Sequence, residues 1–116
     1  YALLRRPRNF LGNVIVVRKL ELDPTKKQVF YDDVEVELTA KEFALLEYLM
    51  RRADGVVSKD EIIDHLWSDD DDVLPNTVEV YIGYLRNKID KKFDVDLIQT
   101  KRGFGYIIKL PWLTNA

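Results

Sequence analysis

The sequence contains no cysteine and only one histidine among its 116 residues. Without cysteine the chain can form neither a disulfide framework nor a thiolate centre, and one histidine leaves the usual zinc sites short of ligands. No apolar run approaches the roughly 20 residues that span a bilayer, and no signal peptide is visible at the amino end. We therefore expect a cytoplasmic protein with no membrane partner, no metal and no cofactor.

The sequence also gives little support for a hydrolase. Neither Ser58 nor Ser68 has a credible base available, because His65 is the sole histidine and cysteine is absent. The aspartate run at residues 69–72 lacks the glycine and the spaced glutamate of an EF-hand loop, so it indicates a solvated acidic loop rather than a calcium site. The sequence predicts a binding protein and not an enzyme.

Length and composition fit one globular domain. The chain is 47% hydrophobic and 33% charged, and its size suits a single buried core. Its formal net charge of -2 hides an uneven distribution. Residues 32–72 hold 14 acids against 4 bases, whereas residues 86–109 hold 7 bases against 3 acids. Binding to an acidic polymer is therefore expected to use the last third of the chain.

The first third of the chain predicts a sheet. Residues 13–38 alternate apolar and polar positions, as in the run Val34-Glu35-Val36-Glu37-Leu38. Turn residues interrupt this alternation at Asp23-Pro24 and again at Asp32-Asp33. Because each interruption is short, neighbouring strands should run in opposite directions. The pattern favours an antiparallel meander.

Two capping boxes predict the next two helices. They are Thr39-Ala40-Lys41-Glu42 and Ser58-Lys59-Asp60-Glu61, in which the first and last residues satisfy each other's free backbone N–H groups. We expect the first helix to start at Ala40, with Gly55 as a fitting residue just past its end. The second helix should run to about Trp67.

A third helix and a hairpin complete the chain. Pro75-Asn76 opens a helix that should continue to about Asp90, and residues 97–109 read as a hairpin whose tip contains Arg102 between Lys101 and a glycine. A basic helix beside such a tip suits one element for a DNA major groove and another for a minor groove. The predicted fold class is α+β, a winged helix-turn-helix with an amino-terminal antiparallel sheet, three helices and a carboxy-terminal β-hairpin wing.

Four sequence blocks in register resemble one known family. They are Leu38-Thr39-Ala40-Lys41-Glu42-Phe43-Ala44-Leu45-Leu46, Val57-Ser58-Lys59 leading to Leu66-Trp67, Val78-Glu79-Val80-Tyr81-Ile82 with Leu85-Arg86-Asn87-Lys88, and Thr100-Lys101-Arg102-Gly103-Phe104-Gly105-Tyr106. They resemble the effector domain of the OmpR/PhoB family of bacterial response regulators, and the resemblance covers residues 14–109. The resemblance implies a transcription regulator of a two-component phosphorelay that binds double-stranded DNA sequence-specifically, with the third helix in the major groove and the wing in the minor groove.

Domain limits and partners follow from the same resemblance. Residues 1–12 resemble a linker and the end of a missing receiver domain, residues 13–110 form the DNA-binding domain, and residues 111–116 form a tail. The partners that it implies are a direct-repeat promoter site, a cognate receiver domain and sensor kinase acting through the full-length protein, and RNA polymerase through loop 68–74.

The expected DNA contacts lie mainly on the third helix and the wing. At 100° per residue, the face opposite the apolar stripe carries Asn76, Val80, Gly83, Tyr84, Asn87 and Lys91, with Thr77 and Lys88 at its edge. Asparagine and lysine can bond base edges, and valine can touch a thymine methyl group. The full set of expected contacts is Trp67, Asn76, Thr77, Val80, Tyr81, Tyr84, Arg86, Asn87, Lys88, Lys91, Thr100, Lys101, Arg102, Gly103 and Tyr106.

On the wing, Arg102 is expected to enter a narrow minor groove. The glycines at 103 and 105 should allow a tight turn with positive φ and a close backbone approach to a phosphate. The resemblance implies sugar-phosphate contacts for Trp67, Arg86, Thr100 and Tyr106.

Structural alternatives stay open for several of these residues. Asn76 could cap the third helix, since Glu79 lies three residues on, and Arg86 could form an ion pair with Glu79 or Asp90. Tyr84 could simply lie on neighbouring side chains. Trp67 could be packed in the core, and Tyr106 could pack within its strand.

The third helix is less basic than in many members of the family, which carry arginine or histidine where this chain has Asn76, Tyr81, Gly83 and Tyr84. Fewer cations release fewer counterions, so binding should be weaker and less steeply dependent on salt. The same depletion leaves a second function open, a winged-helix protein-protein interaction module without DNA binding.

Overall fold

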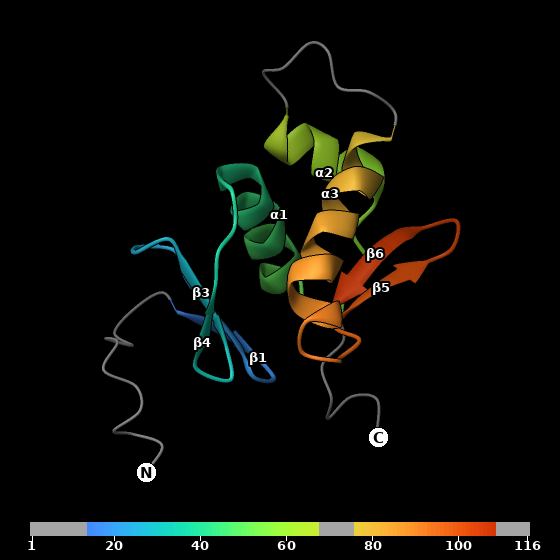
Figure 1. The fold of residues 1–116 in the computed structure, drawn as a ribbon. Helices are drawn as coiled ribbons and strands as arrows, with labels where there is room; N and C mark the ends of the chain where they lie inside the picture. Colours follow the sequence, from blue (N-terminus) through green and yellow to red (C-terminus); the bar gives the residue numbers. More distant parts are fainter. Residues whose placement is uncertain (1–13, 68–75, 109–116) are drawn as a thin grey trace.

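The computed structural model describes residues 14–67 and 76–108. In chain order the elements are β1 (Ile15–Val17), β2 (Leu20–Asp23), β3 (Gln28–Tyr31), β4 (Val34–Val36), α1 (Ala40–Arg51), α2 (Lys59–Leu66), α3 (Thr77–Leu85), the π-helix η1 (Arg86–Lys91), β5 (Ile98–Lys101) and β6 (Gly105–Ile108). The helices lie between the four-stranded sheet on one side and the β5-β6 hairpin on the other (Figure 1). This order matches the predicted arrangement of sheet, three helices and wing.

The amino-terminal sheet is the expected antiparallel meander, with strand order β1-β2-β3-β4. Its turns are local. The Asp23 carboxylate accepts hydrogen bonds from the backbone N–H groups of Thr25 and Lys26 at 3.0 and 3.2 Å. At the next turn Asp32 and Asp33 both have positive φ, 50° and 69°, the conformation that a two-residue hairpin turn requires and that aspartate tolerates.

Both capping boxes form as predicted. At α1 the Thr39 N–H donates to Glu42 at 2.9 Å while the Thr39 hydroxyl accepts from the Glu42 N–H, and Ser58 and Glu61 repeat this exchange at α2. Helix α1 therefore begins at Ala40, as expected. Its end differs from the expectation. Asp54, with φ of 69°, takes the left-handed position, so the glycine that follows it is not the residue that turns the chain.

The third helix changes its hydrogen-bonding pattern in its last turns. It begins at Thr77 as an α-helix and continues from Arg86 as the π-helix η1, a form that occurs mainly in short segments at functional sites. Asn76 has φ of -96° and ψ of 10°, and its side chain makes no capping hydrogen bond. The alternative that Asn76 caps this helix is therefore wrong, because an N-cap side chain accepts hydrogen bonds from the N–H groups two or three residues further on, typically from an extended backbone.

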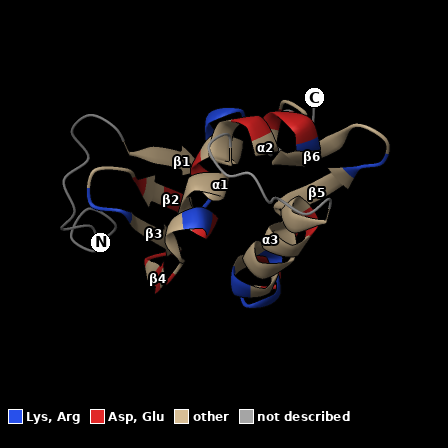
Figure 2. Ribbon diagram, turned by 90° about the horizontal axis from the view of Figure 1, so that it is seen from above, with Lys and Arg blue, Asp and Glu red and all other residues tan. Residues whose placement is uncertain are grey.

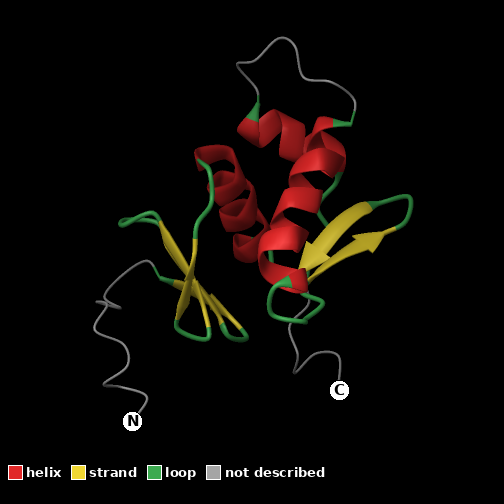
Figure 3. Cartoon of the chain, in the orientation of Figure 1, coloured by secondary structure: helices red, strands yellow, loops and turns green. Residues whose placement is uncertain are grey.

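One hydrophobic core joins the sheet, the helices and the hairpin. Figure 3 shows how these elements are arranged, with the helices between the two groups of strands. Leu45 and Leu46 of α1 are fully buried at its centre, together with Ile82 of α3. The ring of Tyr31 in β3 lies 4.6 Å from the ring of Phe93, which connects the sheet to the segment after η1. Among the described residues no helix combines the length and the apolarity needed to cross a membrane.

Candidate nucleic-acid interface

The wing is joined to the helical core through Val57, which precedes α2. Val57 and Tyr106 exchange backbone hydrogen bonds of 2.8 and 2.9 Å, so Val57 adds a bridge to the outer side of β6. A Cβ atom on Gly105, where φ is 146°, would lie 2.1 Å from the Val57 carbonyl oxygen. The close backbone approach expected at Gly105 is thus made inside the protein, by Val57, and not by a phosphate.

Arg86 connects the third helix, formed by α3 and η1, to the wing. Its Nε donates to the Ile98 carbonyl oxygen at 3.1 Å, and its guanidinium also donates to the Thr100 hydroxyl at 2.7 Å. Arg86 forms neither of the ion pairs considered as alternatives: Glu79 pairs with Lys59 at 3.2 Å, and the Asp90 carboxylate accepts the backbone N–H of Ile98. Against the larger effect of burial, the Arg86 charge still acts to lower the pKa of Asp90. A long cationic side chain therefore lies along the first strand of the hairpin.

Asp90 holds the same strand from the same side as Arg86, since both residues belong to η1. It is 7% exposed, and its carboxylate accepts the Ile98 N–H at 3.1 Å. Burial raises the pKa of Asp90, although hydrogen bonds from the backbone of Ile98 and Leu97 act in the opposite direction. The backbone N–H and C=O groups of Ile98 are thus both hydrogen-bonded to side chains of η1. These bonds fix the first strand of the wing against η1.

Lys88 points toward α1. Its ammonium lies 2.7 Å from the carboxylate of Glu42, whose side chain is 4% exposed. Burial alone would raise the pKa of Glu42, but hydrogen bonds from Lys88 and Thr39 outweigh it, so the pKa is lowered. The predicted contact between Lys88 and DNA has to compete with this internal ion pair.

Three aromatic rings form a row from the core to the surface. The ring of Trp67 is 5.3 Å from that of Tyr81, which in turn meets the ring of Tyr84 edge-on at 5.4 Å. Trp67 is 7% exposed, as the core-packing alternative required, and the Lys41 ammonium lies 5.1 Å from its ring. Tyr84 is 46% exposed, so its ring rests on Tyr81 and still faces outward.

The outward stripe of the third helix is where the helical wheel placed it. Asn76, Val80, Tyr84, Asn87 and Lys91 are exposed, Gly83 of the same face is half-buried, and Thr77 and Lys88 are half-buried at its edge. Helices α3 and η1 are consecutive and form one continuous rod. Figure 2 shows lysine and arginine at the far end of the hairpin and at the carboxyl end of this rod, and acidic residues on α2. Positive charge therefore flanks the stripe at its end and on the wing.

The wing tip is a tight turn that presents two cations. Lys101 and Arg102 are exposed, Gly103 has φ of 84°, and the Phe104 N–H donates to the Lys101 carbonyl oxygen at 2.8 Å. Phe104 is 73% exposed and was not among the expected contacts. A large apolar residue between two glycines at a hairpin tip is the sequence signal that could have identified it.

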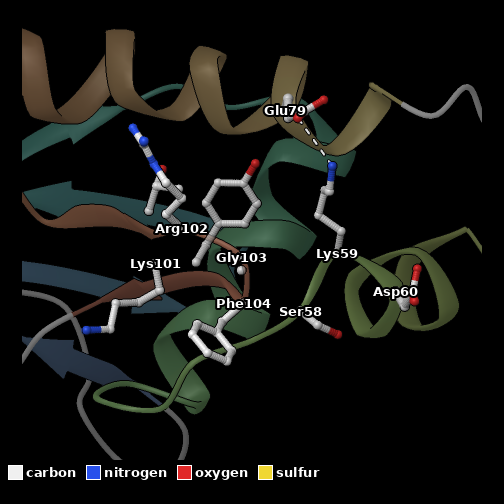
Figure 4. A pocket seen from close by; sticks show the side chains of 11 residues that line it. Ser58, Lys59, Asp60, Glu79, Lys101, Arg102, Gly103 and Phe104 are labelled. Atoms are coloured by element: carbon white, nitrogen blue, oxygen red, sulfur yellow. Dashed lines mark hydrogen bonds and ion pairs between the residues drawn. The ribbon is translucent and has the colours of Figure 1, made fainter.

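A groove of about 450 Å³ separates the wing from the first turns of α2 and α3 (Figure 4). It is lined by Ser58, Lys59, Asp60, Glu79, Thr100, Lys101, Arg102, Gly103, Phe104, Gly105 and Tyr106. Tyr106 is 6% exposed, as the strand-packing alternative required. Its burial, and to a smaller extent the nearby negative charge of Glu79, raise the pKa of the Tyr106 hydroxyl. All five predicted wing contacts, Thr100, Lys101, Arg102, Gly103 and Tyr106, thus share one surface with the start of α2.

Several expectations lie outside the described residues. They are the linker at 1–12, the acidic loop at 68–74 with its aspartate run, and the tail at 111–116. In the ranges 14–67 and 76–108, no three His, Cys, Asp or Glu side chains gather as metal ligands.

Comparison with known proteins agrees with this geometry. The family described as "Transcriptional regulatory protein, C terminal" matches residues 33–108. The two-component response regulator PhoP of Pseudomonas aeruginosa is 40% identical over 106 residues, which cover 91% of this chain and 47% of that protein. The chain thus spans about half the length of this relative.

Solved structures share the fold. The DNA-binding domain of Klebsiella pneumoniae RstA, in complex with the RstA box, gives a TM-score of 0.74 at 27% identity over 84% of this chain and 98% of that one. DrrB of Thermotoga maritima, an OmpR/PhoB homologue, gives 0.74 at 28% identity over 93% of this chain and 51% of that one. The chain therefore belongs to the OmpR/PhoB family of response regulators and forms the winged-helix domain of that family. This domain is a DNA-binding domain of transcription regulators and not an enzyme.

Proposed function

We propose that this domain binds double-stranded DNA sequence-specifically, with α3 and η1 in the major groove and the β5-β6 wing in the minor groove. The observation that carries the proposal is the joint made by Arg86. Because Arg86 bonds both Ile98 and Thr100, the exposed stripe of α3 and the cationic wing tip are held as one unit. Two grooves can then be engaged at once without a large ordering cost at the moment of binding.

Roles divide between reading and positioning. In the major groove the reading residues are Asn76, Thr77, Val80, Tyr84 and Asn87, with Tyr81 and Lys88 at the margin. Lys91, at the far end of the stripe, contacts a phosphate. Sugar-phosphate contacts are assigned to Trp67, Arg86, Thr100, Lys101, Gly103 and Tyr106. Arg102 enters the minor groove, where a narrow, A·T-rich segment has an enhanced negative potential.

The experiment is a titration of the folded domain with DNA selected from a random pool, at two salt concentrations and against scrambled DNA. Specific binding should exceed binding to scrambled DNA by at least about a thousandfold. Binding that is equally weak for both probes would instead support the alternative, a protein-protein interaction module. The exposed apolar side chains of Val80 and Tyr84 are the observation that keeps this second function in view.

The wider context comes from the family. Residues 1–12 act as the linker to a receiver domain, residues 13–110 as the DNA-binding domain and residues 111–116 as a tail. A sensor kinase controls the full-length regulator in the cytoplasm, and loop 68–74 meets RNA polymerase at a direct-repeat promoter. Support for this assignment is the similarity to the two-component response regulator PhoP.

A further inference from the structure

We infer that α3 reads thymine methyl groups and adenine edges, so that the major-groove half-site of this protein consists mainly of A·T pairs. The inference rests on the proposed DNA binding and adds the class of base sequence. It starts from the chemistry that α3 carries, Thr-Val-Glu-Val-Tyr-Ile-Gly-Tyr-Leu from 77 to 85, which includes neither lysine nor arginine. The commonest way to read guanine, a bidentate arginine or lysine on O6 and N7, is therefore absent from α3.

The next two cations along the rod are already engaged. Arg86 donates to the Ile98 carbonyl and the Thr100 hydroxyl, and Lys88 is paired with buried Glu42. Moving Lys88 to a guanine would leave the Glu42 carboxylate buried without its charge partner, which is costly. Lys91 is exposed but lies two turns beyond the middle of the stripe, where phosphate contact is the simpler role.

The exposed stripe offers apolar surface and amides instead. Val80 and Tyr84 are 39% and 46% exposed, and residues four apart on a helix lie on one face. Asn76 and Asn87 lie toward the two ends of the same stripe and are exposed as well. The C5 methyl group of thymine is the apolar feature of the major groove, and asparagine pairs with adenine N6 and N7.

The apolar part of this surface is held in place before DNA arrives. Valine in a helix has one strongly preferred rotamer, and the Tyr84 ring packs edge-on against Tyr81, which packs on Trp67. Little side-chain freedom is then lost when methyl groups pack against Val80 and Tyr84.

Glu79 is the residue of α3 that could read cytosine, because a carboxylate accepts from cytosine N4. Its carboxylate is held by Lys59 at 3.2 Å, on the side of α3 that faces α2 and the wing groove (Figure 4). Readout of G·C pairs is therefore disfavoured at both of their bases.

The test replaces thymine by deoxyuridine, which lacks only the methyl group, one position at a time in the selected half-site. At the thymines that face Val80 and Tyr84 we expect affinity to fall about fourfold, the loss expected for one buried methyl group. In Val80→Ala the same substitution should cost less than about twofold at the position that Val80 contacts. Val34→Ala, on the exposed side chain of β4 (45% exposed), is the matched control and should leave the fourfold loss unchanged.

The possible outcomes are distinct. A specific half-site rich in G·C pairs, or one in which uracil is neutral at every position, overturns the inference and leaves DNA binding intact. The absence of any specific site overturns both. Circular dichroism of Val80→Ala checks that the variant is folded, and Tyr84→Ala provides a second, independent loss of methyl sensitivity at a neighbouring position.

Discussion

The guanidinium of Arg86 lies 2.7 Å from the hydroxyl of Thr100 and joins the first residue of η1 to the third residue of β5. Fourteen positions separate the two residues in sequence. The contact lies at the junction between the proposed major-groove helix and the proposed minor-groove wing. A side chain that is itself expected to meet a phosphate thus helps to set the angle between these two elements, together with Asp90.

Replacing Arg86 tests this double role. Arg86→Ala should destabilise the fold by about 1 kcal/mol, since hydrogen bonds from a charged donor are lost at a partly exposed site. It should also weaken binding to all DNA sequences about equally and lower the salt slope by about 1. Thr100→Val removes only the hydroxyl and should leave the slope unchanged. A change of base preference at constant slope in Arg86→Ala would show that the residue reads bases.

The wing tip offers a matched pair of cations. Arg102→Ala should weaken binding by about 1 to 3 kcal/mol and relax the preference for A·T pairs flanking the half-site, because a minor-groove guanidinium is lost. Lys101→Ala should lower affinity without changing base preference. Both residues are exposed, so the thermal stability of both variants should match that of the wild type. Equal effects of the two variants on base preference would contradict a specific role for Arg102.

The two wing glycines should respond differently to substitution. Gly105→Ala places a Cβ atom against the Val57 backbone and should cost more than about 3 kcal/mol, because backbone atoms must move and positive φ is strained. Gly103→Ala meets no atom within 4 Å and should cost about 1 to 2 kcal/mol, from its positive φ alone. Denaturant unfolding measures both values. Equal losses would mean that the Val57 contact does not constrain the wing.

The pH dependence of stability should report the pair of Glu42 and Lys88. The folded-state pKa of Glu42 lies below its ordinary value of 4.5, so the ionised group stabilises the fold above about pH 4.5. This contribution is lost as pH falls from there through the lowered folded-state value. In Glu42→Gln, which keeps an acceptor for the Thr39 N–H, the unfolding free energy should depend less on pH below 4.5. An unchanged pH profile would show that Glu42 is not stabilised as an anion.

Assembly on DNA should depend on linkage between two copies. The domain alone should sediment as a monomer at micromolar concentration and bind a single half-site weakly. A dimerising fusion should tighten binding to a direct repeat whose half-sites are 10 to 10.5 base pairs apart, about one helical turn, because the second copy gains effective concentration. A repeat offset by about half a turn is the control and should show much less gain. A stable dimer of the free domain would argue against control by a receiver.

Local sequence determined most of the elements of this protein. The capping boxes at Thr39 and Ser58 act within four residues, as does the turn at Asp23, and each formed where the sequence predicted it. The exposed stripe from Asn76 to Lys91 follows from helical periodicity alone. The hairpin was also predicted from local sequence, because its glycines and its alternation of apolar and polar residues lie within a few positions of each other. The structure shows it as β5 and β6.

Only the tertiary structure decided which site residues are free to meet DNA. Lys88 and Glu42 are 46 positions apart, and Arg86 and Thr100 are 14 apart. No local pattern encodes such pairs, because they depend on how α1, η1 and the wing pack together. The same packing brings Val57 against Gly105 and converts an expected phosphate approach into an internal strand contact. Sequence periodicity specifies which face a side chain lies on, whereas packing specifies which partner reaches it first.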